Sequence, residues 1–262
     1  MRADVFLYSH GFAKSRTHAS ELIKSGVLVC GKKISKPSTD IPGNTSAEDI
    51  KITNPSKYVS RGGLKLEAAL AVFNLKTDGI TALDIGASTG GFTDCLLQHG
   101  AKKVYAVDVG HGQLDPSLAN DDRVVNLEGI NARSMTAYMI GRGDFPLAVS
   151  DVSFISQSLI YDSVRALLSE NGIFVSLIKP QFECGKQNLA SGGICKDKKI
   201  HIKVISELLQ SAQNAGLFPV ALTRSPITGG DGNTEYLVCL AKNNESKVSD
   251  EDIKRCVMEG QK

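Results

Sequence analysis

From residue 80 onward the chain alternates short apolar runs with polar or helix-forming segments, and this alternation limits the folds open to it. The first five runs are TALDIG, KVYAVDVG, RVVNLEG, PLAVSDVS and IFVSLIKP. Nearly continuous apolar runs are typical of parallel strands that helices cover on both faces. Two later runs, FPVALTRS and TEYLVCLAK, flank a PITGGDGN loop and are expected to form an antiparallel pair at the end of the sheet. The pattern predicts a doubly wound, Rossmann-like α/β domain.

Residues at the carboxyl ends of the predicted strands are the first candidates for a ligand site, because doubly wound folds bind their ligands there. The stretch LDIGASTGGFTD joins the first strand to a helix. Its glycines Gly86, Gly90 and Gly91 would let the backbone approach a ligand and leave amide groups free at the helix start. A glycine turn is also common as a purely structural connection, so this stretch leaves both interpretations open.

Four further strand ends carry polar or charged residues. Asp108 ends the second strand, where an acidic residue commonly binds a ribose diol, although it could instead cap a helix. The third strand ends in LEGINAR, whose polar side chains could hold an adenine edge or form a simple turn. Asp151 and Lys179 directly follow the fourth and fifth strands, where charged residues are rarely placed for packing; a surface salt bridge is the alternative.

The strand-end residues suit either NAD or S-adenosylmethionine. An NAD site would favour a strict GxGxxG motif, whereas Ser88 stands at the second glycine position here. Together with the pair Asp151 and Lys179 and the antiparallel final strands, this substitution favours S-adenosylmethionine.

The first part of the chain differs from the rest in charge and in pattern. SRTHASELIKSG (15–26) predicts a helix with one apolar face, and VLVCGKKIS predicts a hairpin with a basic tip. Up to residue 65 the chain holds eleven Lys and Arg against five Asp and Glu. A basic helix beside a basic hairpin would suit a phosphate backbone, although a neutral, solvated surface explains the pattern nearly as well.

Length and composition bound the remaining possibilities. With 262 residues, 42% hydrophobic and 22% charged, the chain has room for one large and one small packed domain. The absence of an 18-residue apolar run and of a signal peptide predicts a cytoplasmic protein without stable membrane association. We predict free thiols and no metal site, because no cysteine belongs to a CxxC pair or has a histidine at ligand spacing.

Longer stretches of the sequence resemble known families. RADVFL, KSRTHASELI, SGVLVCGKKI and KPS closely resemble the S4-like RNA-binding module. YVSRGGLKLEAAL, LDIGASTGGFTD, SDVSFIS, LIKPQFE and GGICKD resemble the TlyA or hemolysin A family, and more distantly the FtsJ-like ribose methyltransferases. The resemblance implies 2′-O-methylation of cytidine in the RNA of ribosomal subunits, with S-adenosylmethionine as the cofactor. The domains expected are an RNA-binding domain at 1–55, a linker at 56–62, a methyltransferase domain at 63–243 and a charged tail at 244–262.

The resemblance also assigns roles to individual residues. FtsJ-like enzymes use a Lys-Asp-Lys-Glu set, which falls here on Lys65, Asp151, Lys179 and Glu235. Lys179 would be the general base and Asp151 would orient it, while Lys65 and Glu235 would position the ribose hydroxyl. The expected cofactor contacts are Asp84, Gly86, Ser88, Gly90, Gly91, Phe92, Asp108, Ile130 and Asn131. The expected RNA contacts are Lys14, Arg16, Lys24, Lys32, Lys33 and Arg61.

Two other functions are compatible with these motifs. One is an RNA-binding ribosome assembly factor whose cofactor fold is inactive, although the complete Lys-Asp-Lys-Glu set argues against it. The other is a membrane-active hemolysin, because family members have been discussed as pore-forming. The sequence contains no strongly amphipathic membrane helix that would favour this second alternative.

Overall fold

The computed structural model describes residues 1–13, 16–53, 57–229, 231–243 and 245–259. The chain divides into two compact units, Met1–Lys57 and Tyr58–Lys262. Tyr58, expected to lie in a linker, is buried in the larger unit, and the amide of Val59 donates to the Asp94 carboxylate at 2.8 Å. The segment after residue 57 is therefore packed as part of the larger unit.

The smaller unit packs two helices against a three-stranded antiparallel sheet with the order β2-β1-β3. Its elements are α1 (Ala3–Ser9), α2 (Arg16–Gly26), β1 (Val27–Val29), β2 (Lys32–Ile34) and β3 (Ile50–Ile52), the last preceded by a 3-10 turn at Ala47–Asp49. Both helices and all three strands contribute apolar side chains to one core. The pairing of β3 with β1 joins segments distant in sequence, so the local pattern did not predict this third strand.

The predicted hairpin is present, and its turn lies at Cys30 and Gly31. Their φ angles of 48° and 77° are both positive, as a two-residue type I′ turn requires. Lys32 and Lys33 therefore lie in β2, directly after the turn, and both are exposed.

The larger unit is built on a seven-stranded sheet with the order β6-β5-β4-β7-β8-β10-β9. Its strands are β4 (Thr81–Ile85), β5 (Lys103–Asp108), β6 (Val124–Glu128), β7 (Phe145–Ser150), β8 (Leu168–Ile178), β9 (Phe218–Arg224) and β10 (Tyr236–Ala241). Strands β4 to β8 pair in parallel, which confirms the doubly wound, Rossmann-like fold. The last two strands are antiparallel to each other as predicted, but the reversed strand β10 lies between β8 and β9.

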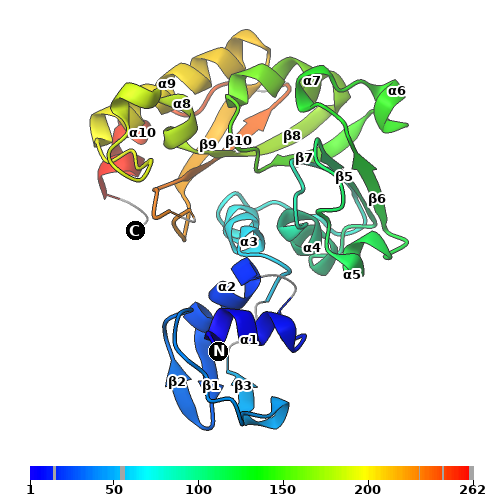
Figure 1. Cartoon of the computed structure of the whole chain (residues 1–262). Helices are drawn as coiled ribbons and strands as arrows, with labels where there is room; N and C mark the ends of the chain where they lie inside the picture. The colour runs from blue at the N-terminus through cyan, green and yellow to red at the C-terminus, as the bar shows by residue number, and fades with distance from the viewer. Residues whose placement is uncertain (14–15, 54–56, 230, 244, 260–262) are drawn as a thin grey trace. The chain divides into compact units, whose positions relative to one another are not determined.

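Helices cover both faces of this sheet (Figure 1). On one face, α3 (Gly62–Val72) and α4 (Gly91–Gln98) pack together and bury Leu66 and Phe92. On the other face, the helices α7 (Tyr161–Leu167), α9 (Lys198–Asn214) and α10 (Asp250–Glu259) contribute to a second core cluster. The shorter helical segments are α5 (Pro116–Ala119), α6 (Ala137–Ile140), α8 (Pro180–Glu183) and the 3-10 turns Ala132–Ser134, Gln157–Ile160 and Lys186–Asn188.

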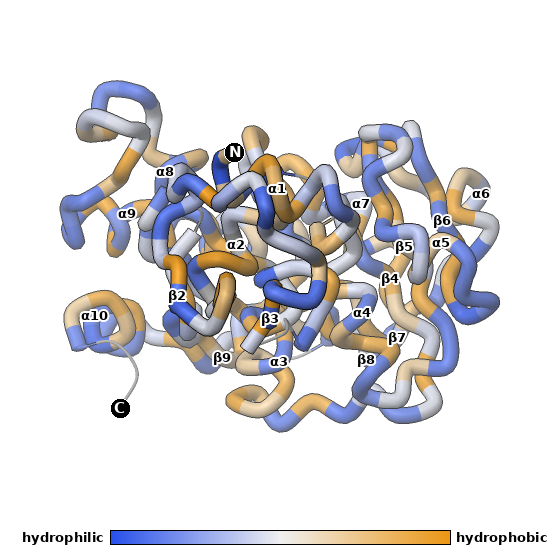
Figure 2. The backbone as a smooth tube through the Cα atoms, turned by 60° about the horizontal axis from the view of Figure 1, so that its bottom comes forward, coloured by the Kyte–Doolittle hydropathy of each residue, from blue (hydrophilic) through white to orange (hydrophobic). Residues whose placement is uncertain are grey.

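The charged C-terminal segment forms helix α10, which packs against α9 and β9. Ile253 and Val257 are buried in this contact. Figure 2, coloured by hydropathy, shows that α10 is hydrophobic along one side and hydrophilic along the other. Its acidic first turn, which includes Asp250, lies at the end of the helix where the dipole favours negative charge. The tail thus completes one face of the larger unit.

Candidate active site

Four ionisable side chains converge at the carboxyl edge of the large sheet. Lys65 comes from α3, Asp151 follows β7, Lys179 follows β8, and Glu235 precedes β10. The Nζ atom of Lys65 lies 2.6 Å from Oε2 of Glu235 and 3.8 Å from Oδ2 of Asp151. The Nζ atom of Lys179 lies 2.5 Å from Oδ1 of Asp151. Together they form a chain of alternating charge, here called the catalytic set: Glu235, Lys65, Asp151 and Lys179.

Burial makes the pairing within the catalytic set important. Lys65 and Lys179 are each 8% exposed, and Glu235 is 2% exposed. Removing one partner of a buried ion pair typically costs about 3–5 kcal/mol, because it leaves an uncompensated charge. Several buried charged groups that depend on one another in this way are more typical of a catalytic site than of a purely structural region.

The strand order delivers three members of the catalytic set to one place. β7 and β8 are parallel neighbours, so Asp151 and Lys179 leave the sheet at the same edge. β10 runs the opposite way beside β8, with Tyr236 paired to Ile178. Glu235 therefore enters the sheet where Lys179 leaves it.

Two glycines bring Lys65 to this edge by letting α3 approach the start of α4. A Cβ atom on Gly91 would lie 2.2 Å from Oγ of Ser60 and 3.0 Å from the amide nitrogen of Gly63. A Cβ atom on Gly63 would overlap the ring of Tyr58. A larger residue at Gly91 would push α3 away from α4, and one at Gly63 would displace Tyr58. The glycine-rich stretch before Lys65 is thus a packing requirement of the site.

Two adjoining cavities open beside the catalytic set. The larger has a volume of about 630 Å³ and the smaller about 170 Å³; small-molecule sites typically span ~300–1,000 Å³. Residues shared by both are Gly86, Ser88, Asp151 and Ser153. The larger cavity is also lined by Asp108, Ile130 and Asn131, and the smaller by Ser60, Gly91, Phe92 and Lys179.

Asp108 gives the larger cavity an anionic wall at the end of β5. Its carboxylate accepts hydrogen bonds from the amides of Ser88 and Gly110, each at 2.8 Å. It does not cap a helix, since the N-cap of the nearby helix α5 is Asp115. Each carboxylate oxygen keeps a further lone pair for another donor. The position suits a ribose diol.

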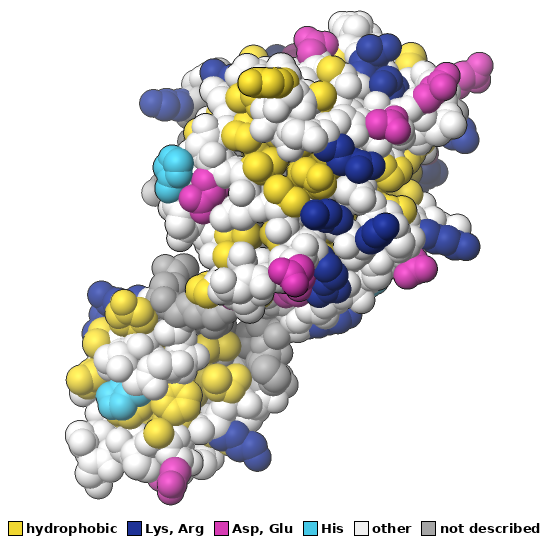
Figure 3. Space-filling view, turned by 90° about the vertical axis from the view of Figure 1, so that its right-hand side faces the viewer, with side chains coloured by type: hydrophobic (Ala, Val, Ile, Leu, Met, Phe, Trp, Pro, Cys, Tyr) yellow, Lys and Arg dark blue, Asp and Glu magenta, His cyan; other side chains and the backbone are white. Residues whose placement is uncertain are grey.

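The outer part of the larger cavity is apolar. Val109, Ile130 and Phe154 line it, and Val109 and Phe154 are highly exposed. The side-chain oxygen of Asn131 accepts from the Arg133 amide at 3.0 Å, which fixes this wall. On the face seen in Figure 3, hydrophobic side chains gather in the middle of the larger unit with basic side chains beside them. Apolar lining with a few fixed polar groups is typical of a site for a nucleoside-sized ligand.

Two of the expected cofactor contacts line neither of these cavities. Asp84 is fully buried, its Oδ2 accepts from Oγ1 of Thr93 at 2.7 Å, and burial raises its pKa to about 7. Gly90 has a φ of 95°, and a Cβ atom there would lie 2.3 Å from the Leu118 side chain. Both residues support the turn between β4 and α4, and their contact with a cofactor stays a prediction.

The remaining residues fit S-adenosylmethionine. The diol of an adenosyl group would meet Asp108, and its base would meet the apolar wall around Ile130. The smaller cavity is lined by Lys179 and by the N-terminus of α4. The free amide groups of a helix N-terminus would favour the carboxylate of the methionine part of S-adenosylmethionine.

Sequence reasoning missed two serines at the centre of the site. Oγ of Ser153 accepts a hydrogen bond from Nζ of Lys179 at 2.7 Å. Ser60 lines the smaller cavity next to the glycines of α3. The only available signal was proximity in sequence, since Ser153 follows Asp151 by two positions.

The expected RNA contacts of the smaller unit differ in their surroundings. Lys24, Lys32 and Lys33 are exposed on α2 and β2. Arg16 instead forms an ion pair with the buried Asp4, with 2.9 Å between its Nη2 and Oδ2 of Asp4. Arg16 therefore also stabilises the fold.

The partners of Arg16 and of Arg61, the expected RNA contact in the larger unit, can also be described. Hydrogen bonds from Arg2 and Arg16 hold the pKa of the Asp4 carboxyl well below its usual range. Arg61, in the larger unit, donates from Nη2 to the carbonyl of Thr228 at 2.7 Å. Lys14 lies outside the described residues.

The described residues contain neither a metal-binding cluster nor a membrane-spanning helix. Within them, no group of three or more His, Cys, Asp or Glu side chains could hold a metal ion. None of the helices described there has the length and hydropathy needed to cross a membrane. All six cysteines are free thiols.

Comparison with known proteins follows the division into two units. Residues 58–242 match the FtsJ-like methyltransferase family, and residues 1–45 match the S4 domain. The 16S/23S rRNA (cytidine-2′-O)-methyltransferase TlyA of Mycobacterium tuberculosis is 39% identical over 99% of this chain and 98% of its own. Hemolysin A of Brachyspira hyodysenteriae is 42% identical over 90% and 98%. The solved structure of a candidate hemolysin from Streptococcus thermophilus matches with a TM-score of 0.79 and 41% identity, over 99% and 94% of the two chains.

Proposed function

Since the chain belongs to the TlyA (hemolysin A) family of FtsJ-like methyltransferases, we propose that it methylates the ribose 2′-hydroxyl of cytidine in ribosomal RNA. The observation that carries this proposal is the convergence of the catalytic set beside a cavity that fits S-adenosylmethionine. The match of the smaller unit to the S4 domain supports RNA as the substrate. A substrate in ribosomal subunits would place the enzyme in the cytoplasm.

Lys179 is the residue best placed to take a proton. When bound, S-adenosylmethionine supplies an electrophilic methyl group on a sulfonium. The ribose hydroxyl is a poor nucleophile until a base removes its proton. Lys179 can do this only as a neutral amine, because an ammonium group has no lone pair. Asp151 and Ser153, at 2.5 and 2.7 Å from Nζ, hold the amine in one orientation.

Lys65 and Glu235 would hold the hydroxyl in line for transfer. Lys65 has three N–H donors, and its contacts with Glu235 and Asp151 leave one for a ribose oxygen. Alignment of reacting groups contributes up to ~7–11 kcal/mol in favourable cases. A general base typically contributes ~10²–10⁴-fold, or about 3–5 kcal/mol. Fixed positioning is thus expected to supply the larger share of the acceleration.

The smaller unit would recruit the RNA through its exposed cations. Lys24, Lys32 and Lys33 can bind phosphates without reading base sequence. Affinity of this kind depends steeply on salt, because binding releases counterions from the RNA.

The test is methyl transfer by the purified protein to isolated small and large ribosomal subunits. Subunits are incubated with S-adenosylmethionine carrying a labelled methyl group, and the RNA is digested to nucleosides for mass spectrometry. We expect label in 2′-O-methylcytidine with the wild-type protein and at least about a hundredfold slower labelling with Lys179→Ala. Label on a base, or no transfer by a protein that binds S-adenosylmethionine and subunits, would overturn the proposal.

A further inference from the structure

The carboxyl edge of the large sheet carries another cavity, distinct from the catalytic set and lined by cations. Its volume is about 320 Å³, and its lining includes Lys196, Lys198 and Arg224. His201, Thr234 and Tyr236 contribute polar groups to it, and no Asp or Glu is among its described lining residues. We call this space the cationic cavity.

Two of the cations of this cavity are held by neutral hydrogen-bond acceptors. Arg224 donates from Nη2 to Oγ1 of Thr234 at 3.3 Å, and Lys198 donates from Nζ to the carbonyl of Met258 at 3.0 Å. Across the described part of the chain, no ion pair joins Lys196, Lys198 or Arg224 to an acidic side chain.

Helix stability does not explain this concentration of charge. Lys198 begins α9, at the helix end where the dipole disfavours cations. The preceding residue, Asp197, caps the helix by accepting from the Lys199 amide at 2.8 Å. Burial is the main cause that lowers the pKa of His201; the charges of Arg224 and Lys198 act in the same direction, while the carboxylate of Asp197 acts in the opposite one. Two cations thus stand against one carboxylate around this ring.

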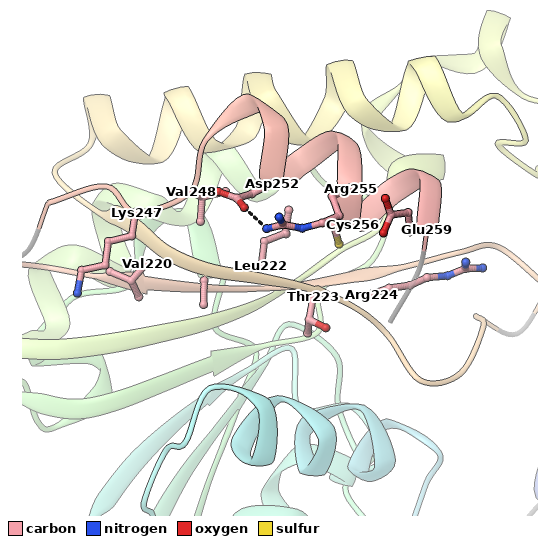
Figure 4. Close-up of a pocket in the computed structure, with 11 residues that line it drawn as sticks. Val220, Leu222, Thr223, Arg224, Lys247, Val248, Asp252, Arg255, Cys256 and Glu259 are labelled. Atoms are coloured by element: carbon pink, nitrogen blue, oxygen red, sulfur yellow. Dashed lines mark hydrogen bonds and ion pairs between the residues drawn. The ribbon is translucent and has the colours of Figure 1, made fainter. Parts of the chain in front are cut away.

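A neighbouring groove between β9 and α10 provides a contrast (Figure 4). This groove, of about 400 Å³, contains Lys247 and Arg255 but also Asp252 and Glu259. Arg255 is ion-paired with Asp252. Arg224 borders both spaces, and in Figure 4 its side chain extends away from the Arg255–Asp252 pair. Unbalanced positive charge is thus a property of the cationic cavity.

The cationic cavity lies close to the catalytic set along the sheet. Arg224 is in register with Tyr236 on β10, and Tyr236 is in register with Ile178 on β8. Two strand spacings, about 10 Å, separate the backbones of Arg224 and Ile178. Lys179 and Glu235 are the sequence neighbours of Ile178 and Tyr236. The cavity opens on the α9 side of the sheet, whereas Lys179 and Glu235, one residue further along their strands, point to the α3 side. An RNA strand with its ribose at Lys179 would therefore reach this cavity by passing round the carboxyl edge of the sheet.

We propose that the cationic cavity, through Lys196, Lys198 and Arg224, binds a backbone phosphate of the RNA close to the methylated nucleotide. The inference rests on the proposed function. An Arg guanidinium offers two parallel donors to phosphate oxygens, and the lysines add compact charges beside it. Such a contact carries no sequence information, but it fixes the register of the strand so that one ribose reaches Lys179.

Steady-state kinetics of methyl transfer to ribosomal subunits test this site. We expect Arg224→Glu and Lys196→Glu each to raise KM for subunits about tenfold, with kcat changed much less and S-adenosylmethionine affinity kept. Because one phosphate would no longer be bound, the slope of log affinity against log salt should also fall by about 1. Arg224→Lys should keep most of the affinity, because it retains the charge.

Lys247→Glu is the matched control, because it makes the same change of charge in the neighbouring groove, where carboxylates are already present. It is expected to leave KM near the wild-type value. Wild-type KM and salt slope in Arg224→Glu and Lys196→Glu would overturn the inference and leave the proposed function standing. If Arg224→Glu unfolds, the test relies on Lys196→Glu, because Lys196 is exposed and its substitution should not disturb folding. No transfer by the wild-type protein would instead remove the proposed function.

Discussion

The two units of the molecule place their positive charges in opposite surroundings. In the smaller unit, Lys24, Lys32 and Lys33 are exposed on a helix and a strand. In the larger unit, Lys65 and Lys179 are buried and held by carboxylates at 2.5 to 3.8 Å. The first arrangement suits a large anionic surface, and the second suits one reacting group.

The difference predicts how each kind of charge responds to substitution. Exposed charges are screened by salt and contribute little singly, so their loss should be graded and salt-dependent. Buried charges depend on particular partners, so their loss should be large and nearly independent of salt. Substitutions in the two units therefore test whether the smaller unit binds RNA and the larger unit carries out catalysis.

The largest effect is expected from Lys179→Ala. Removal of the base should lower the rate of methyl transfer by ~10²–10⁴-fold or more, with RNA affinity nearly unchanged. Single-turnover transfer to ribosomal subunits measures this effect. Lys203→Ala, an exposed lysine on α9 paired with Glu207, is the control. Substantial activity in Lys179→Ala would remove it as the base.

Asp84 is a buried carboxyl that forms no ion pair with a cation among the described residues. Its folded-state pKa is raised to about 7 from 3.8, chiefly by burial. Between these values the folded state holds a proton that the unfolded state has lost, so stability falls as pH rises from about 4 to about 7. A shift of about three units corresponds to at most ~4 kcal/mol.

Asp84→Asn should abolish this decrease in stability between about pH 4 and pH 7. Chemical unfolding across that pH range measures it. Asp121→Asn is the control, because a hydrogen bond from Arg123 lowers the pKa of this half-buried carboxyl instead. Equal pH dependence in Asp84→Asn and the wild type would show that Asp84 is not the group that titrates.

A moderate effect is expected from the double substitution Lys32→Glu and Lys33→Glu. It should weaken binding to ribosomal subunits roughly tenfold and lower the salt slope by about 1 for each phosphate that the variant no longer binds. S-adenosylmethionine binding should not change. Arg16→Glu is a poorer choice, because it would place a second carboxylate beside Asp4. Equal loss of RNA and cofactor binding would contradict the division between units.

The smallest effect is expected from Cys30→Asn in the hairpin turn. Cys30 has a φ of 48°, and Asn adopts the left-handed region more readily than other non-glycine residues. The variant should stabilise the smaller unit by about 0.5 kcal/mol, within the range of Gly and Pro turn substitutions. Thermal unfolding measures it, and a destabilised variant would mean that the thiol has a packing role.

Much of the larger unit was predictable, because its strands are apolar runs that end in polar residues. The place of β10 between β8 and β9 was not predictable, since order along the chain does not fix order in a sheet. The glycine motif pointed to the region of the two cavities, but it did not separate Gly91, which lines a cavity, from Gly90, which packs on Leu118. That distinction depends on neighbours that only the folded chain supplies.

The catalytic set shows the same limit. Resemblance to a family named its four members, yet only the structure shows that Lys65 and Lys179 meet through one carboxylate, Asp151. Ser153 was missed because a single serine beside a charged residue is too common to signal a role. The unbalanced cations near Arg224 were missed because they come from distant segments.

The central claim is that the catalytic set acts as one unit. The most direct test is the single-turnover rate of methyl transfer for Lys65→Ala, Lys179→Ala and the double variant, with subunits saturating and folding checked by thermal unfolding. Residues that act together are strongly non-additive, so the double variant should be no slower than the slower single variant. Rate losses that multiply, as they do for independent sites, would contradict this account.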